Sequence, residues 1–364
     1  MNFNFPLLRP VRILLFPFSL IYLAAIFIRN RLYDWNVLKS DSFNLPVICI
    51  GNIAAGGTGK SPMVEYLIGQ LKDRFRVATL SRGYKRKTTG YTMATAQSTA
   101  LEIGDEPMQF HLKFPDVAIT VGEERVVAVP QILHDRPDTQ AIILDDAFQH
   151  RAIKAGLNII LTDYSNLYTR DWYLPTGDLR DERRSLVRAH IIVVTKCPPT
   201  LAKEEKAAIL AELAPLPGQQ VFFTAIRYGA PYHIISKDAL RLSPDAEALL
   251  VTGIANPRPL KNWLQEKVKT YYEMAYNDHY IFTIDDLKDM VKRFKTLPAG
   301  DKLILTTEKD AVRLVKFETG LRGIPFYVLP IELGFLFNEA ERFNQLIGTF
   351  IREWNREPST KPVV

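Results

Sequence analysis

The stretch GNIAAGGTGKSP, residues 51–62, decides the fold. Phosphate-binding loops have the pattern G-x-x-x-x-G-K-[ST] and connect a strand to a helix. Gly59, Lys60 and Ser61 match the end of that pattern, and Ala54 stands where the first glycine is expected. The apolar run LPVICI precedes the stretch and an amphipathic segment follows it. The stretch therefore predicts a phosphate-binding loop between a strand and a helix.

The loop has the chemistry that a Mg²⁺-nucleotide site needs. Gly56 and Gly57 let successive backbone N–H groups turn toward phosphate oxygens. Lys60 would reach the terminal phosphates, Ser61 would ligate Mg²⁺, and the next helix would present its N-terminus to the anion. A glycine-rich turn without chemical significance is the alternative, but the flanking strand and helix disfavour it. The expected nucleotide-binding residues are Ala54, Ala55, Gly56, Gly57, Thr58, Gly59, Lys60 and Ser61.

Composition indicates a globular protein. The chain has 364 residues, 47% of them hydrophobic and 24% charged, which is enough for two domains. Cys49 and Cys197 lie far apart and form no CxxC, so neither a disulfide framework nor a zinc site is indicated. The formal charge of +6 suits phosphates or anionic lipid without choosing between them. No nucleic-acid recognition motif is present, so nucleic acid is not an expected partner.

The pattern of apolar runs predicts a parallel sheet. Five segments are unbroken apolar runs, as expected for strands buried on both faces of the sheet: VICIGNI, RVATLSR, AIILDD, LNIILTD and HIIVVTK. Amphipathic helical segments such as SPMVEYLIGQLKD lie between them. The fold class is therefore α/β, with a P-loop NTPase-like, three-layer core around a parallel sheet.

A second, smaller α/β set follows QQVFFTAIRYG. We place the boundary near Tyr228 and expect the late strand IPFYVLPIEL to pair with VFFTAIRY as a two-stranded linker. The expected organisation is a membrane-associated N-terminal arm, a P-loop nucleotide-binding core, a smaller α/β domain and a tail. Their respective ranges are 1–40, 41–227, 228–350 and 351–364.

The segment Ile13 to Phe27 carries no charge and has arginines on both sides. It is shorter than the roughly 20 residues of a spanning helix and contains Pro17. No small-residue cleavage site follows it, so a signal peptide is disfavoured. We expect a helix that lies in the membrane interface, with aromatic anchors at Tyr22, Tyr33 and Trp35. A buried core helix is the alternative.

Two carboxylates follow a predicted strand in AIILDDAFQHR. Asp145 and Asp146 come after four apolar residues, as the Mg²⁺-binding acid of a Walker B strand does. A strand that runs into a solvated turn is the alternative, but the phosphate-binding loop favours the metal site. The candidate Mg²⁺ ligands are therefore Ser61, Asp145 and Asp146, and the sequence does not decide which aspartate contacts the metal directly.

Eight segments, in this order and across nearly the whole chain, resemble the tetraacyldisaccharide 4'-kinase family: GNIAAGGTGKSP, SRGYKRK, GDEPMQF, LDDAFQHR, LPTGDLRD, TGIANP, NDHYIF and TTEKDAV. The resemblance implies transfer of the γ-phosphate of ATP, with Mg²⁺, to the 4'-hydroxyl of a tetraacyldisaccharide 1-phosphate, which gives lipid IVA. It also implies location at the cytoplasmic face of the bacterial inner membrane. No obligate protein partner is evident.

The resemblance also implies catalytic roles for four further residues. Asp105 in GDEP matches the acid that takes the proton of the acceptor hydroxyl, and His279 in NDHYIF matches its partner from the second domain. Arg125 and Arg180 match positions near the transferring phosphate, where a guanidinium offsets charge. With Lys60 these form the expected catalytic set. The alternatives are a helix N-cap for Asp105 and a structural histidine for His279.

A membrane-associated P-loop ATPase switch that phosphorylates no lipid is the rival function. The loop AGGTGKS is similar to the deviant Walker loops of some membrane-associated ATPases. Those loops carry a lysine ahead of the glycine pair, where this chain has Ala55. A kinase and a switch differ in whether a lipid acceptor receives the phosphate.

Overall fold

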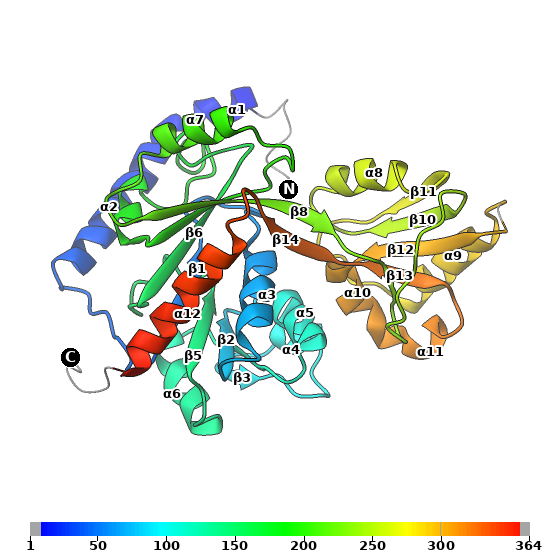
Figure 1. The fold of residues 1–364 in the computed structure, drawn as a ribbon, viewed down its shortest axis with the longest axis horizontal. Coiled ribbons are helices and arrows are strands. Elements are labelled where there is room, and N and C mark those ends of the chain that lie inside the picture. The colour runs from blue at the N-terminus through cyan, green and yellow to red at the C-terminus, as the bar shows by residue number, and fades with distance from the viewer. Residues whose placement is uncertain (1–8, 299, 357–364) are drawn as a thin grey trace.

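The computed structural model of the protein describes residues 9–298 and 300–356. Their strands form two sheets, one of nine strands and one of five. Figure 1 shows the two sheets as separate bodies joined by a pair of strands. Residues 1–8 of the expected N-terminal arm and residues 357–364 of the expected tail lie outside the described residues.

The larger sheet has the strand order β14-β8-β7-β6-β1-β5-β2-β4-β3. Most of its strands are parallel: β1 (Val47–Gly51), β2 (Val77–Ser81), β4 (Ala118–Val121), β5 (Ala141–Asp145), β6 (Leu157–Asp163), β7 (Ile191–Thr195) and β8 (Gln220–Tyr228). The short β3 (Thr92–Met93) and β14 (Ile331–Phe335) are antiparallel at the two edges. The sheet is therefore mixed rather than wholly parallel, because the chain reverses direction at both edges.

Helices cover both faces of the larger sheet. On one face the core includes α3 (Lys60–Leu71), α5 (Asp105–Lys113) and α12 (Ala340–Arg356). On the other face it includes α6 (Arg125–Asp135) and α7 (Lys203–Leu213). Successive residues of β1 alternate between these cores, with Ile48 on one side and Cys49 on the other. This confirms the three layers and explains the unbroken apolar runs, since both faces of each strand are buried.

The smaller sheet has the order β11-β10-β12-β13-β9. Its strands are β9 (Tyr232–His233), β10 (Glu247–Thr252), β11 (Thr270–Ala275), β12 (Lys302–Thr307) and β13 (Phe326–Leu329), of which only β9 is antiparallel. One face packs against α8 (Arg258–Gln265). The other packs against α9 (Ile284–Lys295), α10 (Glu308–Leu314) and α11 (Glu318–Leu321).

The chain enters the smaller domain through β8 and leaves it through β14. These strands pair antiparallel, with Tyr228 opposite Ile331 and Thr224 opposite Phe335. The next helix, α12, packs on the larger sheet, where Phe343 is fully buried beside α3. Residues 340–350, expected in the smaller domain, and residues 351–356, expected in a tail, therefore belong to the larger domain. The amphipathic pattern of a helix shows which of its faces is buried, but it does not show which sheet the helix packs against.

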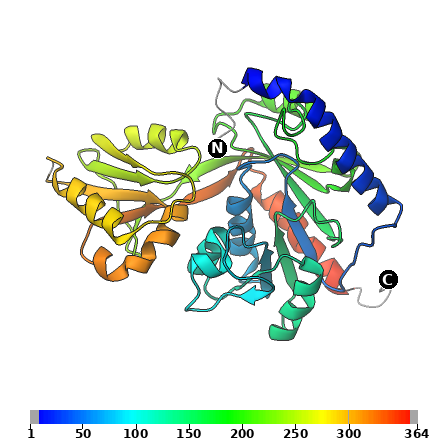
Figure 2. The same cartoon turned by 180° about the vertical axis from the view of Figure 1, so that it is seen from behind.

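The N-terminal helices are α1 (Arg9–Leu14) and α2 (Phe16–Asp34). Figure 2 shows them, in dark blue, along the outer side of the larger domain. Pro17 lies in the first turn of α2, where a proline is tolerated because the backbone N–H there needs no helical partner. In the described part of the chain, no helix has the length and apolar character needed to span a membrane.

The position of α12 predicts that Phe343→Ala destabilises the larger domain by about 3–5 kcal/mol, since it removes a fully buried aromatic ring. Hydrogen exchange followed by mass spectrometry should show lost protection in β1 and α3 and unchanged protection in β10 and β12. Leu346→Ala, on the exposed side of the same helix, is the matched control and should change neither. Equal loss of protection in both sheets would contradict the placement of α12.

Candidate active site

The phosphate-binding loop joins β1 to α3 at the carboxyl edge of the larger sheet. Gly56 and Gly59 have φ of 107° and 88°, in the left-handed region that favours glycine. The N–H of Ala55 donates to the carbonyl of Asp178, so the loop is tied to the LPTGDLRD segment. Gly56 and Gly57 are exposed. The loop is therefore tied at Ala55 and has an accessible backbone at its two glycines, as a phosphate site requires.

Lys60 lies at the start of α3 and faces the carboxyl end of β5. Its Nζ is 3.7 Å from Oδ1 of Asp146 and donates to Oδ1 of Asn52 at 3.3 Å. Burial lowers the pKa of Lys60, and the charge of Asp146 acts in the opposite direction. Arg180 makes an ion pair with the same Asp146 carboxylate and also donates to Asn52. The two cations thus converge beside the loop.

Asn52 is a site residue that the sequence analysis missed. Its amide donates to Oγ1 of Thr58 at 2.8 Å, while its carbonyl oxygen accepts from Lys60 and Arg180. It is fully buried. A polar side chain directly after an apolar strand was the available signal, because a buried amide needs partners.

The predicted metal ligands lie around Lys60. Asp145 is buried and accepts from Oγ of Ser81 at 3.1 Å, while its Oδ1 has no hydrogen-bond partner among the described residues. Burial, then the charges of Glu106 and Asp146, raise the pKa of Asp145 to about 7. Ser61 donates to Oε1 of Glu106 at 2.6 Å. Glu106 therefore links the two predicted ligands, through a hydrogen bond to Ser61 and through its charge to Asp145.

No group of three or more His, Cys, Asp or Glu side chains in residues 9–298 and 300–356 is arranged to hold a metal. Mg²⁺ in nucleotide sites takes few protein ligands and completes its shell with phosphate oxygens and water. The donor set fits that ion, because Asp145 offers a buried carboxylate oxygen without a partner.

Asp105 and His279 come together across the two domains. Nδ1 of His279 lies 2.8 Å from Oδ2 of Asp105. Asp105 is the first residue of α5, and Gly104 is the N-cap, so the N-cap alternative for Asp105 is wrong. His279 has a positive φ of 63°, a strained backbone conformation that is often found at functional sites. The ring of Tyr84 lies 6.0 Å from the ring of His279.

Further cross-domain contacts join α5 to α10, and the sequence analysis assigned no role to Glu106, Lys309 or Arg313. Arg313 donates from Nε to Oδ1 of Asp105 at 3.0 Å and from Nη2 to Oδ2 at 2.5 Å. Lys309 donates to Oε1 of Glu106 at 3.3 Å. Glu106 lies in GDEP and Lys309 lies in TTEKDAV, two segments that the sequence analysis had singled out. The sequence did not show which residues these two side chains contact.

Arg125 does not reach Asp146 as Arg180 does. It is buried at the start of α6, its Nη1 donates to the carbonyl of Glu123 at 3.0 Å, and its Nε has no partner among the described residues. Burial lowers the pKa of Arg125, and the charge of Asp145 acts against that effect. Arg125 is therefore close enough to interact electrostatically with Asp145, while its own hydrogen bond goes to the backbone of Glu123.

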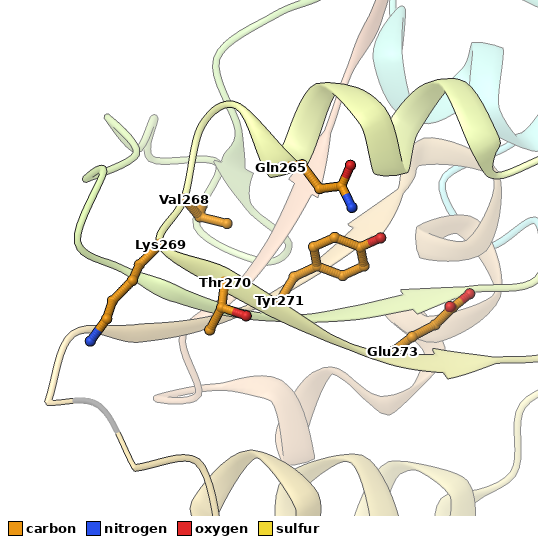
Figure 3. Close-up of a pocket in the computed structure, with 6 residues that line it drawn as sticks. All are labelled: Gln265, Val268, Lys269, Thr270, Tyr271 and Glu273. Atoms are coloured by element: carbon orange, nitrogen blue, oxygen red, sulfur yellow. The ribbon is translucent and has the colours of Figure 1, made fainter.

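A separate pocket lies at the far edge of the smaller domain. It has a volume of about 410 Å³ and is lined by Gln265, Val268, Lys269, Thr270, Tyr271 and Glu273. Figure 3 shows it at the end of α8 and along β11, which is an edge strand of the smaller sheet. None of the predicted site residues lines it, so it is not the nucleotide site.

Comparison with known proteins identifies relatives along nearly the whole chain. The family model described as tetraacyldisaccharide-1-P 4'-kinase matches residues 11–352. The tetraacyldisaccharide 4'-kinase of Bacteroides fragilis is 44% identical over 357 residues, which cover 95% of this chain and 94% of that protein. The enzyme of the same name from Flavobacterium johnsoniae is 43% identical and covers 96% and 99%.

A solved structure is also similar. The crystal structure of LpxK from Aquifex aeolicus in complex with ATP has a TM-score of 0.74 and 28% sequence identity. The similarity covers 94% of this chain and 99% of that one. Sequence and fold agree along nearly the full length. The chain therefore belongs to the tetraacyldisaccharide-1-P 4'-kinase family.

Proposed function

We propose that this protein transfers the γ-phosphate of ATP to the 4'-hydroxyl of a tetraacyldisaccharide 1-phosphate and so forms lipid IVA in lipid A biosynthesis. The contact of Asp105 with His279 beside the phosphate-binding loop carries the proposal. Its neighbour Glu106 accepts from Ser61 of that loop, so the proton acceptor lies next to the phosphate site. The names of the relatives support the same acceptor.

The loop binds and orients the nucleotide. Its backbone N–H groups and the N-terminus of α3 attract the phosphates. Lys60 and Arg180, which pair with Asp146 here, supply positive charge for the transferring phosphoryl group. When a phosphate enters, one of the two cations can turn toward it while the other stays paired with Asp146. Neither the cations nor the carboxylate is then buried without an opposite charge.

Mg²⁺ would be held by Ser61 and by Asp145 or Asp146, and it would neutralise charge that develops on the phosphate oxygens. The unpartnered Oδ1 of Asp145 favours this residue as a direct ligand. Asp146 is already engaged by Lys60 and Arg180.

Asp105 accepts the proton of the acceptor hydroxyl, and His279 orients the carboxylate. The larger domain supplies Asp105 and the smaller domain supplies His279, so the pair is complete only when the domains are in contact. Such contact also excludes water from the phosphate. A nucleotide switch needs no such cross-domain proton acceptor, which disfavours the rival function.

The N-terminal helices support a membrane location for the acceptor. On an ordinary surface helix, apolar side chains are buried and polar side chains are exposed. Here the arrangement is reversed, because polar Ser19 and Asn30 are buried and apolar residues face outward. The exposed apolar residues are Ile13, Leu14, Phe16, Phe18, Leu20, Ile21, Phe27 and Ile28. Such a surface fits an interfacial helix at the cytoplasmic face of the inner membrane.

The buried side of α2 contacts the catalytic loops. Asn30 donates to Oδ1 of Asp181 at 2.9 Å, and the hydroxyl of Tyr22 donates to the carbonyl of Arg180 at 3.2 Å. The helix would therefore hold the site close to the lipid surface. Deleting it would also disturb Arg180, so substitution of its outward residues is the cleaner test.

Asp105→Asn should reduce kcat by about 10²–10⁴-fold, because the amide cannot accept the proton. Affinity for ATP should not change, since Asp105 makes no contact with the loop. The measurement is transfer of radiolabelled γ-phosphate to tetraacyldisaccharide 1-phosphate in mixed micelles.

The control is Asp285→Asn, which removes an exposed charge of the smaller domain and should retain full activity. Phosphate released to water, with no labelled lipid formed by the wild-type protein, would favour the ATPase switch.

Replacing Phe18 and Ile21 together by glutamate should sharply reduce partition to vesicles that contain anionic lipid, because each glutamate must leave water for the interface. Turnover on a short-chain, monomeric acceptor should be retained. Leu346→Glu places one such charge on an exposed apolar residue of α12 and should leave sedimentation with vesicles unchanged. Unaltered binding of the double variant would show that this face does not meet the membrane.

A further inference from the structure

Arg313 is a buried charge at the contact between the two domains. It is 7% exposed and lies at the end of α10. Two of its nitrogens face the two carboxylate oxygens of Asp105, and Nη2 also lies 3.0 Å from Nδ1 of His279. A guanidinium that faces both oxygens of one carboxylate restricts its rotation as well as neutralising its charge.

We propose that Arg313 is a positioning residue, which fixes the Asp105 carboxylate against His279 and so orients the proton acceptor when α10 lies against α5. This inference rests on the proposed transfer to a hydroxyl acceptor. Arg313 reaches neither the phosphate-binding loop nor Asp146, so it acts through Asp105.

In the smaller domain, the backbone of Gly253 holds both His279 and, through Asp310, Arg313. Oδ1 of Asp310 lies 3.6 Å from Nη1 of Arg313, and Oδ2 of Asp310 accepts from the N–H of Gly253 at 3.0 Å. The N–H of His279 donates to the carbonyl of the same Gly253 at 3.3 Å. Thr307 also donates to Asp310, which has no exposed surface. The segments TTEKDAV, TGIANP and NDHYIF therefore form one frame that presents two side chains to Asp105.

The charges around Asp105 come from every element packed against it. They are Glu106 on α5, Lys309, Asp310 and Arg313 on α10, and Asp278 and His279 on the loop after β11, with Tyr84 beside the histidine. Burial alone would raise the pKa of Asp105, but hydrogen bonds from His279 and Arg313 outweigh it and lower the pKa to about 2.

The sign of the pH effect follows from these contributions. The carboxylate is the active form and predominates above its pKa. Without the positive charge of Arg313, burial is opposed only by His279, so the pKa of Asp105 rises. When saturating Mg²⁺ keeps the Asp145 carboxyl ionised, the acidic limb of the rate profile should then move to higher pH from its low wild-type position, by about 1–3 pH units for loss of an adjacent arginine.

Two variants separate orientation from charge. Arg313→Lys keeps the positive charge but cannot face both oxygens at once. Arg313→Met keeps a long apolar side chain and loses both properties. Lys113→Met is the matched control: it removes another α5–α10 ion pair, in which Lys113 Nζ lies 2.9 Å from Oε1 of Glu308. Lys113 makes no contact with Asp105. It also pairs with Glu65 of α3 at 2.7 Å, so this control weakens the domain contact and one ion pair inside the larger domain while leaving Asp105 untouched.

The experiment measures kcat, KM for ATP, KM for the lipid acceptor and the pH profile of kcat/KM in mixed micelles, with thermal unfolding in parallel. We expect Arg313→Lys to lower kcat about tenfold with an unmoved acidic limb. Arg313→Met should lower kcat about 10²-fold or more and move the limb upward. Both should keep the wild-type KM for ATP. Lys113→Met should lower the melting temperature and leave the limb in place.

An Arg313→Met profile that coincides with wild type, with a kcat no lower than that of Lys113→Met, would reduce Arg313 to a domain contact and overturn the proposal. If Arg313→Met does not fold, Arg313→Lys decides: retained kcat overturns the proposal, and reduced kcat with normal ATP binding supports it. A wild-type protein that labels no lipid overturns the proposed function itself, and the role of Arg313 with it.

Discussion

Parallel strand direction is the constraint on which the site depends. Because β1, β2, β5 and β7 are all part of the parallel run in the larger sheet, their carboxyl ends meet at one edge. The phosphate-binding loop follows β1 there, and Asp145 and Asp146 follow β5. From the end of β7, Thr195 donates to the carbonyl of Thr58 at 2.8 Å, which braces the loop from a strand two places away. The parallel direction of the strands thus brings together the residues expected to bind the nucleotide.

The acceptor half depends on a second sheet. The smaller domain is joined to the larger one by the antiparallel pair β8 and β14, and it meets the larger domain again where α10 contacts α5. Ion pairs dominate that second contact, with a small apolar cluster in which Val312 packs against Ile103 and Met108. Charged contacts of this kind pair well in one geometry and exchange readily with water, as in interfaces between domains that move relative to one another.

The sequence predicted those features whose signals are local. A strand buried on both faces is an unbroken apolar run, and a phosphate-binding loop is a short pattern, so β1, β2, β5, β6, β7 and residues 54–61 could all be placed. Residues whose roles depend on distant partners could not. The local sequence does not indicate which groups the side chains of Asn52, Lys309 and Arg313 contact. It likewise does not indicate which sheet α12 covers. The N-terminal segment was recognised as apolar, but the contact of Asn30 with Asp181 is visible only in three dimensions.

The return of α12 to the larger sheet has a consequence for biosynthesis. The face of that sheet formed by Ile48, Ile50 and Phe222 stays without its last covering helix until the ribosome has added the whole smaller domain. The interval from the end of β8 at Tyr228 to the start of α12 at Ala340 is about 110 residues, or roughly 5–20 s of translation. During that time the smaller sheet, encoded in one continuous segment, can be completed first. The nascent larger domain is therefore the part of the chain most in need of chaperone protection.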